Sequence, residues 1–156
     1  IETIQDRITH LNKLREQQDS SGGFQCFVPY PFLKDNTRLP EARLASGEEV
    51  IRVISISRIM LDNIPHIKAY RMNIGDHLST IAINSGADDI DGTVGHEEIM
   101  HVAGSTTNLN YDSYKLGNLI DSAGQNPVKR DSTYTRFEPL EIKPKREGKL
   151  LPIIGQ

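Results

Sequence analysis

The feature that most constrains the fold is the regular alternation of two kinds of segment along the chain. Amphipathic stretches with helical spacing of their apolar residues are separated by short, strand-like apolar runs. This order implies right-handed crossovers and a parallel sheet. We therefore predict an α/β fold with three or four parallel strands, each covered by a helix on one side. Helices are expected at residues 4–21, 46–64, 76–85 and 116–123, a helical turn at 97–102, and strands at 24–28, 67–72 and 90–94.

Glycine, serine and proline mark where several of these segments begin and end. Gly22 and Gly23 follow the first helical stretch and supply a left-handed cap. Ser46 and Glu49 form a capping box that opens the second helix. Pro65 then stops that helix, because proline cannot continue it.

Three further segments lie outside the alternation. Residues 33–45 are polar and contain proline, which predicts a loop on the side of the active site. Residues 128–134 are expected to form a final strand or an extended return. We divide the chain into residues 1–137, the α/β unit, and residues 138–156, an extended basic tail.

The composition excludes several classes of protein. The chain has 156 residues, of which 37% are hydrophobic and 25% charged, enough for one domain with a core. A net charge of −3 argues against nucleic-acid binding, and no apolar run approaches the length that spans a membrane. The single cysteine, Cys26, fits a reducing cytoplasm and is too few for an iron–sulfur cluster. The chain begins at Ile1 without a signal-peptide pattern, so we expect a piece of a longer cytoplasmic protein.

Two charged runs are the main candidates for a site. His66, Lys68 and Tyr70 alternate with apolar residues, so they share one face of a strand. Asp89 and Asp91 alternate in the same way in the next strand. Strand ends in an α/β barrel present polar side chains to a common site. We predict that His66, Lys68, Asp89 and Asp91 lie in one pocket at the C-terminal ends of adjacent strands.

The residues alone leave more than one interpretation of these charges open. Two acidic side chains inside a barrel need a positive partner such as Lys68 or Arg58, either in a structural ion pair or in a substrate site. A zinc-protease helix needs two histidines four residues apart, whereas His96 and His101 are five apart and point away from each other. Glu97 and His101 have the spacing of a hydrogen-bonded pair on a helix.

Several blocks of the sequence resemble aminofutalosine synthase, a radical S-adenosylmethionine enzyme of the futalosine route to menaquinone. The similarity is greatest in the runs DNIPHIKAY and GADDIDGTV. The blocks lie in order and at compatible spacing, between about residues 2 and 135. They are residues 22–25, 35–37, 57–58, 62–70, 86–94, 97, 101–104 and 130–131.

This resemblance implies a (β/α)8 barrel of the TIM type, of which the chain is the C-terminal half. The complete enzyme would use S-adenosyl-L-methionine and a 4Fe-4S cluster, with the cluster-binding cysteines in the N-terminal half. The implied reaction adds the 5′-deoxyadenosyl radical to 3-[(1-carboxyvinyl)oxy]benzoate, and rearrangement with decarboxylation gives aminodeoxyfutalosine. The implied partners are this small-molecule substrate, the N-terminal half and a reductant protein. The chain by itself is expected to hold no cluster and to show no turnover.

The resemblance implies mainly binding roles for these residues, because radical addition needs no strong general base. No catalytic residue and no metal ligand are assigned in this chain. Cationic side chains suit the two carboxylates of the substrate, and carboxylates suit a ribose or an amine. The expected substrate-binding residues are His66, Lys68, Tyr70, Arg58 and Gln25, and the expected cofactor-binding residues are Asp89, Asp91, Thr93 and Glu97.

Two other functions also fit the sequence. The sibling family, dehypoxanthine futalosine cyclase, is similar at residues 22–24 and 62–65 but less so at 66–70 and 88–93. A non-catalytic half-barrel that binds a partner would also fit. The chain departs from the synthase pattern at Arg71, where an aromatic residue is usual.

Overall fold

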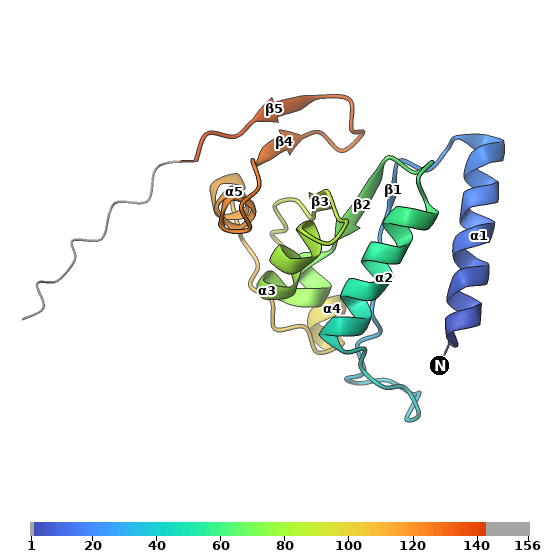
Figure 1. The fold of residues 1–156 in the computed structure, drawn as a ribbon. Helices are drawn as coiled ribbons and strands as arrows, with labels where there is room; N and C mark the ends of the chain where they lie inside the picture. Colours follow the sequence, from blue (N-terminus) through green and yellow to red (C-terminus); the bar gives the residue numbers. More distant parts are fainter. Residues whose placement is uncertain (1, 143–156) are drawn as a thin grey trace, which may run out of the picture.

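The computed structural model describes residues 2–142, in which helices alternate with short strands (Figure 1). Three strands form a parallel sheet, and two later strands form a separate antiparallel hairpin. The elements are α1 (Ile4–Ser21), β1 (Cys26–Phe27), α2 (Gly47–Met60), β2 (His66–Ala69), α3 (Arg71–Ile83), β3 (Asp89–Ile90), α4 (Ile99–Val102), α5 (Ser113–Ser122), β4 (Val128–Arg130) and β5 (Phe137–Pro139).

Helix α1 begins and ends at the predicted kind of cap. Thr3 and Asp6 form a capping box at its start, and Gly22 ends it with a left-handed φ of 60°. Among the apolar residues of this helix, Leu11 is buried, whereas Ile4 is 74% exposed. The helix therefore packs against the rest of the described structure from its centre to its last turns, where Gln18 is also buried.

Helix α2 opens with the predicted capping box. The Ser46 hydroxyl accepts a hydrogen bond from the Glu49 N–H at 3.1 Å, and the Glu49 carboxylate accepts one from the Ser46 N–H at 3.1 Å. These two bonds satisfy amides that the helix itself leaves unpaired. The helix ends at Met60, so Pro65 follows a short turn and does not terminate the helix directly.

Removing the Ser46 hydroxyl should destabilise the protein moderately. We expect Ser46→Ala to lower the free energy of unfolding by about 1 kcal/mol, because the Glu49 amide loses the hydroxyl that accepts its hydrogen bond. Urea titration of the protein measures the change. Ser20→Ala, at an exposed position inside α1, is the matched control and should change the value by less than about 0.5 kcal/mol. Equal effects of the two substitutions would contradict the capping role.

The parallel sheet confirms the main prediction of fold class. Strand β2 lies between β1 and β3, with Cys26 opposite His66 and Lys68 opposite Asp89. Within residues 2–142, β1 and β3 are each paired along one edge only. The arrangement is a three-stranded segment that is compatible with part of an α/β barrel.

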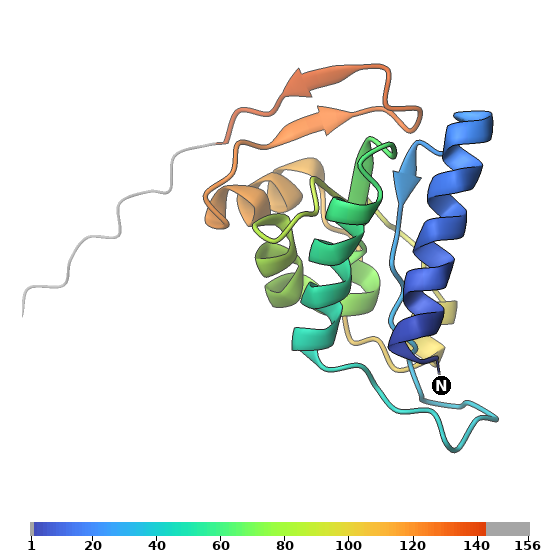
Figure 2. The same cartoon turned by 45° about the vertical axis from the view of Figure 1, so that its right-hand side comes forward.

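Helices α1, α2 and α3 lie on one face of this sheet (Figure 2). Ile67 and Ala69 of β2 point toward these helices and are fully buried. Ile56 of α2 is 40% exposed and lies outside this core. The buried residues of this core are Val50, Ile54, Ile67, Ala69, Ala82, Ala87, Ile90 and Leu116.

The chain turns from strand to helix earlier than predicted. The strand expected at residues 67–72 stops at Ala69, and α3 begins at Arg71. The Asp91 carboxylate accepts a hydrogen bond from the Arg71 backbone N–H, which satisfies an otherwise free amide of the first turn. Helix α3 then kinks at Gly75, whose φ of 80° is open to glycine without strain.

The third strand is also shorter than predicted. Strand β3 covers only Asp89–Ile90, and the residues expected to continue it to 94 form an irregular loop. The helical turn expected at 97–102 is present as α4, Ile99–Val102. The short strand places Asp91 at its C-terminal end.

Residues 128–139 form the β4–β5 hairpin, which lies across the amino-terminal ends of the parallel strands (Figures 1 and 2). The expected extended return is therefore paired with a further strand. After β5, an added Cβ at Gly117 would lie only 2.6 Å from Leu140 and 2.7 Å from Ile142. The start of the expected tail packs closely on α5, and residues 143–156 lie outside the described part.

Candidate functional site

The face of the sheet that points away from the helices carries polar side chains, and we call it the inner face. Along β2, His66 and Lys68 are partly buried while Ile67 and Ala69 are buried in the core. Tyr70 follows Ala69 and continues the polar side of this alternation. The sequence prediction that His66, Lys68 and Tyr70 share one face is confirmed.

At the amino-terminal end of the inner face, four side chains form a cluster that we call the floor: His66, Asp89, Arg130 and Tyr134. The Arg130 guanidinium donates to both Asp89 oxygens, at 3.0 and 2.7 Å, and the Tyr134 hydroxyl donates to Asp89 Oδ2 at 2.6 Å. The Tyr134 ring stacks on His66 with 4.3 Å between the ring centroids. Burial and the Asp89 carboxylate raise the pKa of Tyr134, so its phenol remains a donor.

Lys68 lies opposite Asp89 of the floor, one residue before the C-terminal end of its strand. Its ammonium nitrogen is 3.5 Å from Asp89 Oδ2, and its side chain is 20% exposed. This distance is longer than an ordinary charge-assisted hydrogen bond. In the described residues the three N–H groups of Lys68 have no other carboxylate within ion-pair distance.

At the C-terminal end of the inner face, four side chains form a second cluster that we call the rim: Tyr30, Tyr70, Asp91 and Glu97. The rings of Tyr30 and Tyr70 are tilted by 49°, with centroids 5.0 Å apart. The Tyr70 hydroxyl donates to Glu97 Oε2 at 3.4 Å. Burial, followed by the nearby Tyr30, Glu97 and Asp91, raises the pKa of Tyr70 to about 12, so the phenol stays protonated near neutral pH.

Asp91 is buried beside an equally buried arginine. The side chain of Asp91 is 4% exposed and that of Arg71 is 0% exposed, with 3.6 Å between Asp91 Oδ2 and Arg71 Nε. Asp91 Oδ2 has no hydrogen-bond donor among the described residues. Burial raises the pKa of Asp91, and Arg71 acts in the opposite direction. The rim therefore holds one buried carboxylate oxygen that accepts no hydrogen bond from the described residues.

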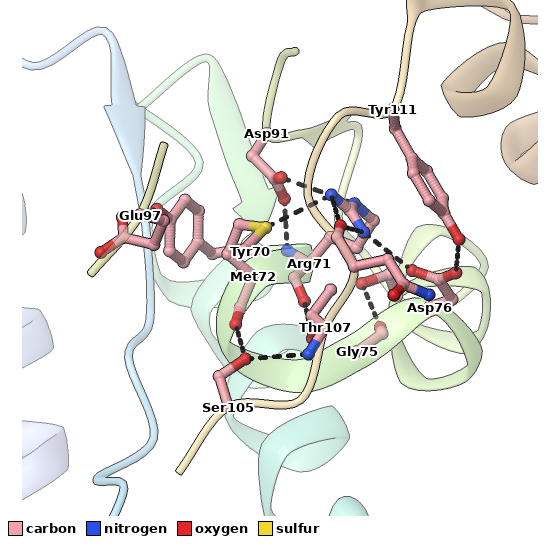
Figure 3. Close-up of polar contacts among 12 residues, drawn as sticks. Tyr70, Arg71, Met72, Gly75, Asp76, Asp91, Glu97, Ser105, Thr107 and Tyr111 are labelled. Carbon is pink, nitrogen blue, oxygen red and sulfur yellow. Dashed lines mark hydrogen bonds and ion pairs between the residues drawn. The ribbon is translucent and has the colours of Figure 1, made fainter. Parts of the chain in front are cut away.

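Arg71 ties several segments together beneath the rim (Figure 3). Its guanidinium donates to Asp76 Oδ1 and to the Asn108 carbonyl oxygen, both at 3.1 Å. It also lies over the Tyr111 ring at 4.3 Å, and the Tyr111 hydroxyl donates to Asp76 Oδ2 at 2.7 Å. This one side chain thus links β3, α3 and the loop that precedes α5.

Two hydroxyl groups fasten the same loop to the start of α3 (Figure 3). The Ser105 hydroxyl donates to the Met72 carbonyl at 2.5 Å, and the Thr107 hydroxyl donates to the Arg71 carbonyl at 3.3 Å. The expected pair of Glu97 with His101 does not form, because His101 Nε2 lies 2.9 Å from the Thr107 carbonyl oxygen.

Arg58, an expected substrate residue, lies at the amino-terminal ends of the strands. Its guanidinium donates to Asp88 Oδ1 at 2.6 Å and to the Gly86 carbonyl at 2.7 Å. Asp88 also lies 2.8 Å from His66 Nδ1 and accepts the Ile67 N–H at 2.7 Å. These contacts give Arg58 a structural role in joining α2 to the starts of β2 and β3.

Two other expected site residues lie at the margins. Gln25 is exposed immediately before β1, and the next residue, Cys26, is paired with His66. Because neighbouring strand residues face opposite sides, Cys26 and not Gln25 lies on the inner face. Burial raises the pKa of the Cys26 thiol. Thr93 is exposed in the loop that follows β3.

The four residues predicted to share one pocket do share the inner face, but they are spread along it. His66 is the first residue of β2, so its placement at the C-terminal end is wrong, whereas Asp89 lies opposite Lys68, one residue before the end of its two-residue strand. Asp91 lies at the C-terminal end, and Lys68 is level with Asp89. The polar alternation identified the face correctly and could not specify the level of each residue along it.

Sequence reasoning missed four residues that shape the site: Tyr30, Arg71, Arg130 and Tyr134. Tyr30 follows β1 in the extended segment with two prolines, and Arg71 directly follows Tyr70. Both positions lie just past a strand end, which is a usable criterion for site residues. Arg130 and Tyr134 come from a hairpin far along the chain, and local pattern carries no information about such long-range contacts.

A cavity of about 630 Å³ lies on the helix side of β1, between α1 and α2. Its wall includes Phe27, Tyr30 and Val50, and its edge carries the Arg43–Glu49 pair, with 2.8 Å between the closest atoms. The cavity meets the rim only through Tyr30, and we assign it no part in the candidate site.

The described residues, 2–142, contain no group of three histidine, cysteine, aspartate or glutamate side chains that could hold a metal ion. In the same residues no helix combines the length and the apolar character that crossing a bilayer would require.

Comparison with known proteins identifies the family. The family described as the CofH/MqnC C-terminal region matches residues 21–142. The chain belongs to this family. The matched range includes all residues of the floor and the rim.

Relatives of the CofH/MqnC C-terminal family carry three different names. The chain is 36% identical to "Aminodeoxyfutalosine synthase" of Thermus thermophilus over 138 residues, which is 86% of this chain and 37% of the relative. It is 34% identical to "Cyclic dehypoxanthine futalosine synthase" of Streptomyces coelicolor over 85% of this chain and 33% of the relative. It is 36% identical to "5-amino-6-(D-ribitylamino)uracil--L-tyrosine 4-hydroxyphenyl transferase" of Methanoculleus marisnigri over 85% of this chain and 37% of the relative. The chain therefore spans little more than a third of the length of these proteins.

Proposed function

We propose that the chain is part of a radical S-adenosylmethionine enzyme that adds the 5′-deoxyadenosyl radical to 3-[(1-carboxyvinyl)oxy]benzoate and forms aminodeoxyfutalosine. Membership of the CofH/MqnC C-terminal family and 36% identity to an aminodeoxyfutalosine synthase support this proposal. The observation that carries it is the position of the Lys68 ammonium on the inner face, 3.5 Å from Asp89 and so beyond an ordinary charge-assisted hydrogen bond. In the complete enzyme, the three strands would continue into a (β/α)8-type barrel whose interior the inner face lines.

The middle of the inner face suits an aromatic carboxylate. The Lys68 ammonium would bind one carboxylate of the substrate, because an unsatisfied cation on a partly buried face favours an anion. The aromatic ring of the substrate would pack near the tilted pair of Tyr30 and Tyr70. We therefore propose that Lys68 and Tyr70 bind the substrate and that His66, in the floor, lies next to them on the same face of β2.

The rim suits a ligand that is rich in hydrogen-bond donors. The free Oδ2 of buried Asp91 and the carboxylate of Glu97 match the hydroxyls of a ribose or an ammonium group. We therefore propose Asp91 and Glu97 as residues that hold S-adenosylmethionine, with Thr93 at the exposed edge. Asp89 was expected in this set, but its two oxygens already accept hydrogen bonds from the floor. When bound and reduced, S-adenosylmethionine supplies the 5′-deoxyadenosyl radical.

The 4Fe-4S cluster does not fit the part of the chain that the structure describes. Such a cluster needs several thiolates, and Cys26 is the single cysteine of this sequence. The cluster ligands would belong to the N-terminal half of the enzyme. The task of this chain is to bind and orient the two ligands and to exclude water from them.

A second candidate is the cyclase reaction, which the 34% identity to a cyclic dehypoxanthine futalosine synthase keeps open. The sequence at residues 66–70 and 88–93 favours the synthase. These two segments contain Lys68 of the inner face and Asp91 of the rim. A non-catalytic binding module is the third candidate, and a measurable product would exclude it.

A product assay tests the proposed function. The complete protein that contains this chain, reconstituted without oxygen, is expected to convert S-adenosylmethionine and 3-[(1-carboxyvinyl)oxy]benzoate to aminodeoxyfutalosine, detected by mass spectrometry. The same preparation with dehypoxanthine futalosine is the matched comparison and should give no cyclic product. Turnover of dehypoxanthine futalosine alone would replace the synthase with the cyclase, and turnover of neither would leave the binding module.

A further inference from the structure

The β4–β5 hairpin adds a charged side chain to the inner face. Three residues of the parallel strands, Cys26, His66 and Asp89, lie close to Tyr134 of this hairpin. Tyr134 stacks on His66, and the Arg130 guanidinium lies over the Tyr134 ring at 4.1 Å. The hairpin therefore brings one additional positive charge, Arg130, to the floor.

Asp89 has little capacity left for Lys68. Its carboxylate accepts two bonds from Arg130 in the bidentate geometry and a third from the Tyr134 hydroxyl. The side chains of Asp89 and Arg130 are only 11% and 19% exposed, so this pair is largely shielded from water. Lys68 Nζ remains at 3.5 Å, outside this set of short contacts.

The charges on this part of the inner face do not balance. Lys68 and Arg130 face the single carboxylate of Asp89, which leaves one positive charge in excess. The next carboxylate, Asp88, is already bound by Arg58 at 2.6 Å and lies 2.8 Å from His66. A partly buried excess cation is unfavourable unless an anion meets it.

We propose that Arg130 is a positioning residue: by occupying Asp89 together with Tyr134, it leaves the Lys68 ammonium available to an anionic group of the ligand. This inference rests on the proposed function, in which that group is a substrate carboxylate. Without Arg130, Asp89 would have Lys68 as its nearest cation, and the ammonium would be drawn into an internal ion pair. Arg130 would thus control substrate binding without touching the substrate.

Four variants of the complete protein test this inference by equilibrium binding of 3-[(1-carboxyvinyl)oxy]benzoate. Arg130→Met should weaken binding at least about tenfold. Adding Asp89→Asn to Arg130→Met should restore affinity to within about threefold of the parent, because the competing carboxylate charge is gone. Asp89→Asn alone should also stay within about threefold. Arg136→Met, at an exposed position of the same hairpin, is the matched control and should change nothing.

The outcomes separate this inference from the proposed function. If Lys68→Met binds the substrate as well as the parent does, the substrate role of Lys68 fails. If Lys68→Met weakens binding but Arg130→Met does not, or if Asp89→Asn gives no rescue, only the role of Arg130 fails. Thermal unfolding checks that each variant is folded. Should Arg130→Met not fold, Asp89→Asn decides alone, and a loss of more than about tenfold overturns the inference.

Discussion

Replacing Arg71 with methionine is expected to lower the free energy of unfolding by about 3–5 kcal/mol, because it leaves a buried carboxylate without its cation. The Arg71 side chain is 0% exposed and lies beside Asp91, which is 4% exposed. It also donates to Asp76 and to the Asn108 carbonyl, so several polar groups would lose their partner together. Chemical denaturation of the protein measures this change.

Arg52→Met is the matched control for Arg71→Met. Arg52 pairs with Glu48 on the exposed surface of α2, where its side chain is 63% exposed. Exposed pairs of this kind contribute about 0–1 kcal/mol. Similar losses for the two variants would show that the network around Arg71 does not stabilise the fold as the structure indicates.

Replacing Lys68 with methionine should weaken substrate binding by about 2–5 kcal/mol, if the ammonium meets a substrate carboxylate in a desolvated pair. The affinity for S-adenosylmethionine should change much less, because the proposed cofactor residues, Asp91 and Glu97, lie at the rim. Both affinities are measured on the same variant of the complete protein. The comparison separates binding of the substrate from binding of the cofactor.

Lys129→Met serves as the control for Lys68→Met, since Lys129 is exposed on β4. It should leave both affinities unchanged. If Lys68→Met also leaves both affinities unchanged but lowers stability, Lys68 is only a structural partner of Asp89. That outcome would favour the interpretation of the charges as an internal ion pair.

The sequence was sufficient for the order and type of the main elements. Capping residues such as Ser46 and Gly22 are local, and the structure confirms the helix boundaries that they mark. The end of β2 was missed, because the turn into α3 depends on the Asp91 carboxylate, about twenty residues further along the chain. The local sequence around β2 carries no information about such a long-range contact.

For the candidate site too, the local features could be predicted from the sequence and the long-range contacts could not. Alternation along β2 gave the correct face for Lys68 and Tyr70, because that pattern depends only on strand geometry. Arg71 was noted as a departure from the family pattern, but nothing in its local sequence showed that it would be buried. Arg130 was seen only as a matching block, since its partner Asp89 is 41 residues away.

The separation of floor and rim has a consequence for how relatives of this chain can diverge. The rim side chains Tyr30, Tyr70 and Glu97 come from segments that follow the strands, whereas Arg130 and Tyr134 of the floor come from the separate β4–β5 hairpin, which lies near the opposite ends (Figure 1). Substitutions at one end can therefore alter ligand preference while the other end keeps its charge arrangement. Such a division would let one ancestral scaffold give rise to several chemistries through changes confined to a few exposed loops.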